Sequence, residues 1–263
     1  MSNDTLPINR KSEFKYLMKY RWKTLLIIGG IIFLFSAPLL VSLFLKDLKA
    51  ISIVTTSEGS DISTLLINDL FYAVFIIPSF IVLFIGLAGV YRIIRNYIWA
   101  EGVLLKSDFF IGIKQNWKHF AITGFLFSLM YYGIYLSALY INVSFVKYLP
   151  FALCVIFIYP VLLVHMNLTV IYKNNYLMQF KNALYLYIKR FYIYLPLFLL
   201  LILIPFLVSV FSIPLLAKYI ILLFYIYLFI PFYILGISLY SISVFDENIN
   251  KSRHQDLYKK GLF

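Results

Sequence analysis

The most unusual residue of this sequence is a histidine inside a long apolar stretch. His165 lies within Leu149–Ile171, and Asn167 follows it two residues later. If the stretch is a membrane helix, polar side chains in it are costly unless they face protein or water, so the pair is a candidate intramembrane polar site. Positions i and i+2 of a helix point about 200° apart, so the two side chains should face different neighbours. A structural hydrogen bond between helices is the simpler role for His165.

Motifs that mark enzymes and metal sites are missing from the sequence. The chain has no Gly-rich phosphate loop, no His-Glu-x-x-His and no Gly-x-Ser-x-Gly, and its single cysteine, Cys154, lies in an apolar run. We therefore expect no catalytic residue, no cofactor and no metal ion, and we predict that the protein is not an enzyme. The 11 Asp and Glu residues all lie outside the long apolar stretches, which counts against an ion-coupled carrier.

The composition requires an apolar solvent. Of the 263 residues, 63% are hydrophobic and only 13% are charged, whereas about a quarter of the residues of a soluble domain are charged. A water-soluble globule of this size could not hide so much hydrocarbon and keep a polar surface, so the solvent must be lipid. Lipid offers no partner for open backbone groups, and period-2 alternation is absent, so the spanning elements should be helices.

Six stretches without a charged residue are long enough to cross the hydrocarbon core, which takes around 20 helical residues. We predict spans at Thr24–Leu45, Leu70–Tyr91, Phe120–Ile141, Leu149–Ile171, Phe191–Phe211 and Tyr219–Leu239. The expected fold is an all-α polytopic membrane bundle of six transmembrane helices. Its parts are an N-terminal segment 1–23, a transmembrane domain 24–245 and a tail 246–263.

Five of the spans contain a proline, which tends to kink a helix. The prolines concerned are Pro38, Pro78, Pro160, Pro205 and Pro231. Kinked spans are common in transporters, but proline is also frequent in membrane helices in general.

The basic residues predict the orientation. Nineteen of the 23 Lys and Arg residues fall on one side of the predicted spans, and only Lys46, Lys49, Lys147 and Lys218 fall on the other. By the positive-inside rule, both termini are cytoplasmic and the protein is a multi-pass protein of the plasma membrane. The net charge of +12 is then mostly a topology signal. It predicts attraction to anionic lipid headgroups and no binding of nucleic acid.

Three stretches on the predicted cytoplasmic side have the pattern of amphipathic helices that lie in the membrane interface. They are Ser12–Trp22, Ser107–Phe120 and Tyr176–Phe191. The side chains that these helices offer to a partner protein are candidate docking residues: Phe110, Lys114, Asn116, Trp117, Phe180 and Lys181. Anchoring of the aromatic side chains at headgroup level is the alternative, and the two roles are compatible.

About 35 residues of the chain resemble a known family. The motifs are Gly86-Leu-Ala-Gly89, Arg92-Ile-Ile-Arg95 and Ser107-Asp108-Phe109-Phe110-x-x-Ile113-Lys114-Gln115-Asn116-Trp117-Lys118. They resemble the YesL-like family of bacterial integral membrane proteins, in which a phenylalanine is followed by lysine, any residue and asparagine. The resemblance implies an accessory role beside a carbohydrate importer of the ATP-binding cassette type, with no catalytic residue. The longer outer loop and the long polar tail depart from the family's pattern.

Two functions of different classes follow. The first is a non-enzymatic subunit that associates with another membrane complex, for which the resemblance names a carbohydrate importer. The second is a stand-alone carrier or channel for a small solute, which the five prolines and His165 favour. A membrane enzyme would need polar residues clustered at one membrane depth, and the sequence shows no such cluster.

A reporter fused after Phe263 tests the predicted orientation. We expect a fused alkaline phosphatase to be inactive and a fused green fluorescent protein to fluoresce, because the positive-inside rule keeps the tail in the cytoplasm. The same phosphatase inserted after Gly59, in the predicted outer loop, is the control and should be active. Phosphatase activity of the Phe263 fusion in intact cells would reverse the orientation.

Overall fold

The computed structural model describes residues 9–56, 62–141, 143–211 and 213–262. Within these ranges the chain forms helices and their connections without any strand, which confirms the all-α class. Six helical segments of the described chain are long and apolar enough to cross a membrane. The chain is therefore a multi-pass membrane protein.

Each of the first three membrane segments is one long helix. These are α1 (Arg10–Thr56), α2 (Ile62–Ile98) and α3 (Leu105–Tyr140). The fourth segment comprises α4 (Ser144–Leu153), the π-helical turn η1 (Cys154–Ile158) and α5 (Tyr159–Ile171). The short α6 (Tyr176–Lys189) leads into α7 (Phe191–Val210). The last segment comprises α8 (Leu215–Phe224), η2 (Tyr225–Phe229), α9 (Ile230–Phe245), η3 (Asp246–Asn250) and α10 (Lys251–Arg253).

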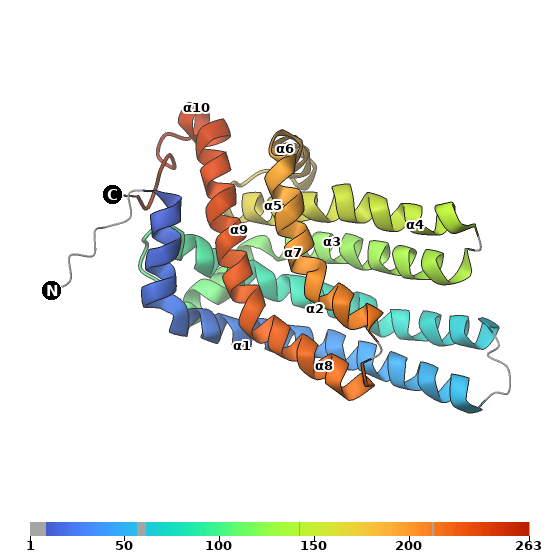
Figure 1. Ribbon diagram of the computed structural model, residues 1–263. Coiled ribbons are helices and arrows are strands. Elements are labelled where there is room, and N and C mark those ends of the chain that lie inside the picture. The colour runs from blue at the N-terminus through green and yellow to red at the C-terminus, as the bar shows by residue number, and fades with distance from the viewer. Residues whose placement is uncertain (1–8, 57–61, 142, 212, 263) are drawn as a thin grey trace.

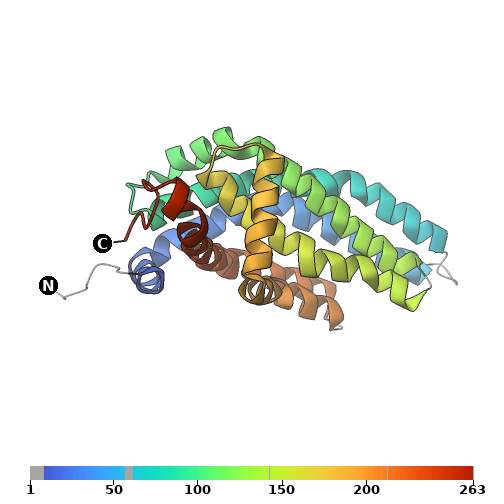
Figure 2. The ribbon, with the colours of Figure 1, turned by 90° about the horizontal axis from the view of Figure 1, so that it is seen from above.

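Helices α2 to α5 and most of α1 run side by side, α7 and the last segment run obliquely to them, and α6 lies across the bundle (Figures 1 and 2). Helix α2 packs along both α1 and α3, and α9 packs against α1. The start of α1, the connection between α2 and α3, α6 and α10 lie at one end, which we call the terminal end. The end of α1, the start of α2 and the starts of α4 and α8 lie toward the other, which we call the far end (Figure 1).

The predicted spans all lie within the observed helical segments, apart from residues at their ends, but several helices are longer than predicted. Helix α1 continues past Leu45 to Thr56, and α2 begins at Ile62 rather than at Leu70. The membrane fixes only the crossing part of a helix: from Lys23 to Lys46, a rise of 1.5 Å per residue gives about 34 Å, close to the hydrocarbon thickness. Beyond it the chain stays helical because no proline or glycine interrupts it before Thr56.

Two of the three amphipathic stretches are continuous with a membrane helix. Ser12–Trp22 belongs to α1, whose first turns run crosswise to the rest of the helix, and Ser107–Phe120 belongs to α3 (Figure 1). Only the third stretch forms a separate helix, α6. Segment boundaries at residues 23 and 245 therefore fall inside helical segments that run on without a break.

The tail packs back onto the bundle at the terminal end. Lys260 Nζ donates to Glu101 Oε1 at 2.7 Å and lies 4.4 Å above the Trp99 ring. Gly261 has a φ of +89°, and a Cβ built on it would lie 2.1 Å from the Ile98 carbonyl oxygen, so only glycine fits there. These contacts join the end of the chain to the end of α2.

A buried ionic group ties the start of α1 to the last segment. Arg10 donates to Glu13 at 2.8 Å and to Asp246 at 3.0 Å, and both carboxylates are almost fully buried. Asn250 donates to Asp246 Oδ1 at 2.8 Å, and the Tyr172 hydroxyl donates to Asn250 at 2.5 Å. The group joins α1, the end of α5 and η3, so the helix ends are fixed relative to one another.

Glycines allow α2 and α3 to approach closely. A Cβ built on Gly112 would lie 2.9 Å from the Gly89 Cα and 2.9 Å from the Ala88 carbonyl oxygen. A Cβ built on Gly86 would lie 2.4 Å from the Phe35 ring of α1. Small residues at such positions let the backbones of membrane helices meet.

Two prolines remove a backbone donor whose acceptor finds a tyrosine hydroxyl on another helix. Pro160 cannot donate to the carbonyl of Ile156, and the Tyr187 hydroxyl of α6 donates to that carbonyl instead. Pro205 likewise cannot donate to Leu201, whose carbonyl accepts the hydroxyl of Tyr225. In lipid no water can fill this role, so each hydroxyl compensates for a missing intrahelical bond.

A third proline is compensated by close approach. Pro231 leaves the carbonyl of Tyr227 without its usual donor, and this oxygen faces Gly29 of α1. A Cβ on Gly29 would lie 2.1 Å from it, so the bare glycine Cα allows a Cα–H···O contact. Figure 1 shows α1 crossing the last membrane segment. These prolines therefore mark points where helices contact one another.

A double-mutant cycle measures the contact between Tyr187 and the proline-bearing segment. We expect Tyr187→Phe to lower the free energy of unfolding by about 1–2 kcal/mol, because the Ile156 carbonyl loses its donor and lipid offers no other. In a Pro160→Ala background the carbonyl regains a backbone donor, so the same change should cost less than about 0.5 kcal/mol. The measurement is denaturant unfolding in mixed micelles.

The exposed Tyr148 provides the matched control for this cycle. Its side chain is 57% exposed, so Tyr148→Phe should change the unfolding free energy by less than about 0.5 kcal/mol in either background. Equal costs of Tyr187→Phe with and without Pro160 would show that the hydroxyl does not compensate for the proline.

Candidate functional site

His165 lies in α5 and faces α3 and α6. It is 1% exposed, and its Nδ1 is 3.5 Å from Thr123 Oγ1 of α3. The Tyr176 ring of α6 packs on it with 4.5 Å between ring centroids. The His119 ring lies nearly parallel to it, with centroids 6.3 Å apart. The predicted intramembrane histidine is thus part of a polar group formed by three helices.

The hydrogen-bond directions in this group follow from counting protons. Thr123 donates its only hydroxyl proton to the carbonyl of His119 at 2.9 Å, so its oxygen must accept from the other neighbours. Burial raises the pKa of the Tyr176 phenol, which therefore keeps its proton and donates to Thr123. Because the Thr123 oxygen can only accept, the proton between it and His165 must belong to His165 Nδ1. His165 Nε2 is buried and has no hydrogen-bond partner among the described residues.

Gln179 is the centre of the group and links three helices. Its Oε1 lies 3.0 Å from His119 Nδ1 of α3 and 2.8 Å from Thr169 Oγ1 of α5, whose single hydroxyl proton is shared with the His165 carbonyl at 2.9 Å. Its Nε2 donates to the carbonyl of Tyr172 at 2.6 Å. The residue is 2% exposed. Gln179 thus gives His119 a partner and holds α6 in its crosswise position.

Gln179 was not identified from the sequence. The outward stripe of Leu177, Leu184 and Ile188 is the more apolar one and dominates the pattern of α6. The inward stripe consists of the buried residues Gln179, Ala183, Leu186 and Tyr187. Its helical spacing is the one signal that could have indicated a second packed face.

Asn167 points away from His165, as the helical spacing requires. It is buried, and its side chain donates to the carbonyl of Leu163 at 3.1 Å. With Tyr91, Arg95 and Ser238 it lines a cavity of about 10 Å³ between α5, α2 and α9. A space of this size is close to the minimum that holds one water molecule.

The candidate docking residues divide into two sets. On the surface are Phe110, which is 59% exposed, and Lys114, Trp117 and Lys181. Asn116 and Phe180 instead contact other parts of the protein. Asn116 donates to the carbonyl of Gly112 at 3.1 Å, and the centroid of the Phe180 ring lies 6.3 Å from that of His165. Four of the six side chains are therefore available to a partner.

The outward side of α6 is mainly apolar and is available for contact. We call this surface the α6 face, made up of the exposed residues Leu177, Met178, Lys181, Leu184, Tyr185 and Ile188. Leu177 is 73% exposed and Ile188 is 63% exposed. Figure 2 shows that α6 starts beside α3 and runs across α5 toward α7. The face belongs to the terminal end of the bundle.

A second polar group lies at the far end. Lys46 of α1 is 4% exposed, and its Nζ lies 3.8 Å from Asp47 Oδ1 and 3.9 Å from Asp69 Oδ1 of α2. Lys218 of α8 donates to Asp47 at 2.8 Å, and the Tyr219 hydroxyl donates to the same carboxylate at 3.0 Å. Two cations and two anions thus form a neutral group that joins α1, α2 and α8.

Metal-ligating side chains do not gather in the described part of the chain, where no group of three or more His, Cys, Asp and Glu could hold an ion. In comparisons with known proteins, no protein-family model, curated protein or solved structure matches the chain. Function must therefore be argued from these two ends of the bundle.

Removal of the Gln179 side chain tests its role as the link between α6 and the bundle. We expect Gln179→Ala to lower the free energy of unfolding by about 2–3 kcal/mol, because His119, Thr169 and the Tyr172 carbonyl all lose a buried partner. The matched Gln115→Ala removes an exposed amide that pairs with Arg92, and it should cost less than about 0.5 kcal/mol. Denaturant titration in mixed micelles gives both values, and similar costs would contradict the role of Gln179.

Proposed function

We propose that this membrane protein is a non-enzymatic subunit that binds another integral membrane protein through the α6 face, on the cytoplasmic side of the membrane. The observation that carries the proposal is a rigidly held helix with an apolar outer side. Tyr185 and Ile188 of that side are 61% and 63% exposed. Exposed aromatic and aliphatic side chains on a fixed support are typical of residues that dominate binding energy.

The inner side of α6 has the support that such a surface needs. Gln179 bonds to α3 and α5, and the Tyr187 hydroxyl bonds to the carbonyl of Ile156. A partner therefore meets a helix that is already ordered, and association avoids part of the entropic cost of fixing a mobile segment. Simple anchoring in the lipid interface needs an amphipathic helix but no such specific inner contacts.

The α3 side chains Phe110, Lys114 and Trp117 extend the proposed docking surface. They follow one another at helical spacing and are exposed, and they fall within the motif that resembles the YesL-like family. That resemblance selects the first companion to test, the membrane subunits of a carbohydrate importer of the ATP-binding cassette type. Lys114 and Lys181 add positive charge, which suits a partner with acidic residues or anionic lipids at the same level.

Purification of the full chain in a mild detergent, followed by mass spectrometry, tests this proposal. We expect one integral membrane protein to co-purify in a fixed ratio. Tyr185→Ala combined with Ile188→Ala should lower its recovery roughly tenfold or more, because truncation of two central side chains removes much of the binding energy. A photo-crosslinking residue at position 185 should attach to the same companion.

Two lipid-facing residues of α7 give the matched control. Leu203 and Phe206 are 47% and 50% exposed, and their replacement by Ala should leave recovery of the companion unchanged. Isolation of the chain alone, or equal losses for both pairs, would contradict the proposal.

A stand-alone carrier is the second candidate function. The buried His165 Nε2, which has no partner among the described residues, is the observation that favours it, because such an atom suits a transient ligand. Solute flux across reconstituted vesicles that is lost in His165→Ala would select the carrier over the subunit.

A further inference from the structure

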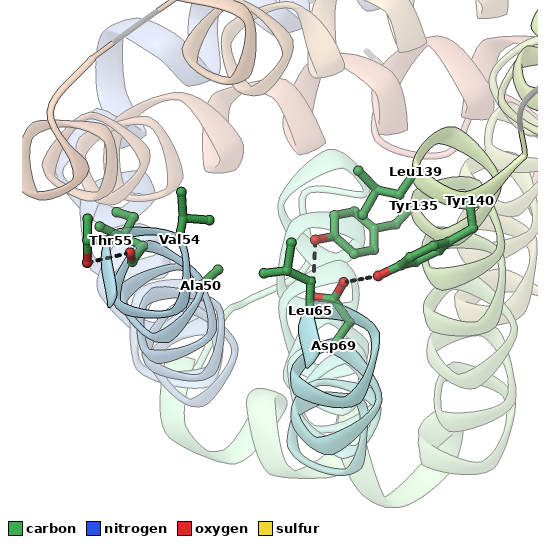
Figure 3. A pocket seen from close by; sticks show the side chains of 9 residues that line it. Ala50, Val54, Thr55, Leu65, Asp69, Tyr135, Leu139 and Tyr140 are labelled. Carbon is green, nitrogen blue, oxygen red and sulfur yellow. Dashed lines mark hydrogen bonds between the residues drawn. The ribbon is translucent and has the colours of Figure 1, made fainter. Parts of the chain in front are cut away.

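A cleft opens at the far end between α1, α2 and α3 (Figure 3). Its volume is about 470 Å³, within the range of small-molecule sites. The lining residues are Ala50, Ile51, Val54 and Thr55 of α1, Leu65 and Asp69 of α2, and Tyr135, Leu139 and Tyr140 of α3. Most of the wall is apolar; the carboxylate and the two phenols lie on the side formed by α2 and α3, and the Thr55 hydroxyl lies on the α1 side.

The polar groups of the cleft converge on one carboxylate. Asp69 is 3% exposed and accepts the hydroxyl of Tyr135 at 3.1 Å on Oδ1 and that of Tyr140 at 3.3 Å on Oδ2. Figure 3 shows the three side chains together, across the gap from Ala50 and Val54. A buried carboxylate flanked by two aromatic rings is thus presented at one side of an apolar cleft.

These polar groups can accept hydrogen bonds but have no proton left to donate. Both tyrosine protons are directed to Asp69, and the Thr55 hydroxyl proton is directed to carbonyls of its own helix. What remains toward the cleft is lone pairs and the π faces of the rings. A bound molecule must therefore supply the donors, and a positive charge suits both the carboxylate and the rings.

Lys46 shows how an ammonium group fits this environment. Its Nζ lies 3.9 Å from Asp69 Oδ1 and 3.9 Å from the centroid of the Tyr135 ring. Lys46 is not among the residues that line the cleft, and it occupies the Oδ1 side of the carboxylate. On the other side, Asp69 Oδ2 accepts one hydrogen bond, from the Tyr140 hydroxyl at 3.3 Å. The charge of Lys46 is also shared with Asp47, at 3.8 Å.

We propose that this cleft binds an organic ammonium ion with an apolar body, the ammonium group on Asp69 Oδ2 and the Tyr140 ring and the apolar part between Val54, Leu65 and Leu139. The proposal goes beyond the docking function, since it concerns the opposite end of the bundle. Leu139 and Val54 are each 54% exposed, so the apolar side of the cleft is open to an entering molecule. An anion would face only acceptors and is excluded by the same chemistry.

Binding of three probes of one shape tests the proposal. The probes are 3-phenylpropylammonium, 3-phenylpropanol and 3-phenylpropanoate, titrated calorimetrically into the full chain in phosphatidylglycerol nanodiscs, with empty nanodiscs as blank. We expect the ammonium ion to bind at least tenfold more tightly than the alcohol, and the carboxylate not to bind. Asp69→Asn should weaken binding of the ammonium ion at least tenfold.

Asp47→Asn is the matched control, because it removes the other carboxylate of the same ionic group without touching the cleft. It should weaken binding clearly less than Asp69→Asn does, because Asp69 and the tyrosine rings stay in place while Lys46 loses one of its two carboxylate partners. Val54→Trp and Leu139→Trp fill the cleft, keep every charge and alter half-exposed positions, and each should abolish binding. Equal binding of amine and carboxylate, equal effects of the two Asn substitutions, or normal binding by the Trp variants would overturn the proposal.

The ammonium group could belong to a free amine or to a lipid headgroup, and the lipid of the nanodisc separates these sources. If phosphatidylethanolamine occupies the cleft, its addition to the nanodisc should weaken the apparent affinity for 3-phenylpropylammonium at least threefold in the unmodified chain and not change the residual signal of Leu139→Trp. An affinity unaffected by this lipid assigns the cleft to a free amine.

Discussion

The structure depends on one constraint: in lipid, no solvent molecule replaces a missing hydrogen-bond partner. Prolines interrupt the intrahelical bonds, and hydroxyls of Tyr187 and Tyr225 reach the affected carbonyls from other helices. The same constraint applies to a polar side chain: the buried amide of Gln179 finds partners on α3 and α5. Each of these bonds joins two segments. Satisfying a polar group in this protein therefore also fixes how two helices pack.

The ionic contacts lie at the two ends of the bundle, and between them the packing is apolar apart from the tyrosine hydroxyl bonds. In lipid, apolar side chains gain little by leaving the solvent, so packing there depends on shape, as where Gly124 of α3 faces Phe84 of α2. The ionic groups around Arg10 and Lys46 are buried, and the cost of desolvating buried charges offsets much of their attraction. Their main effect is to specify which helix ends meet, because a slipped helix would leave a charge unpaired.

The sequence predicted the elements well where one physical requirement determines them. The start of α7 at Phe191 and the end of α5 at Ile171 coincide with the predicted spans, because charges or polar residues stand directly outside. Contacts between distant residues have no such signature. Lys260 and Glu101 are 159 positions apart, and no periodicity relates them. The two stripes of α6 show the same limit, since composition does not tell which one faces protein.

The two ends of the protein differ in charge for a reason that connects topology with binding. Basic residues are concentrated at the terminal end, where they suit anionic surfaces. At the far end the cations Lys46 and Lys218 are balanced by Asp47 and Asp69. The hydroxyl protons of Tyr135 and Tyr140 are both directed to Asp69, so these tyrosines present only acceptors to the cleft. Lys46 occupies the Oδ1 side of Asp69, and the Oδ2 side keeps only the Tyr140 hydroxyl, so this is the side that we propose for a cation from outside the chain.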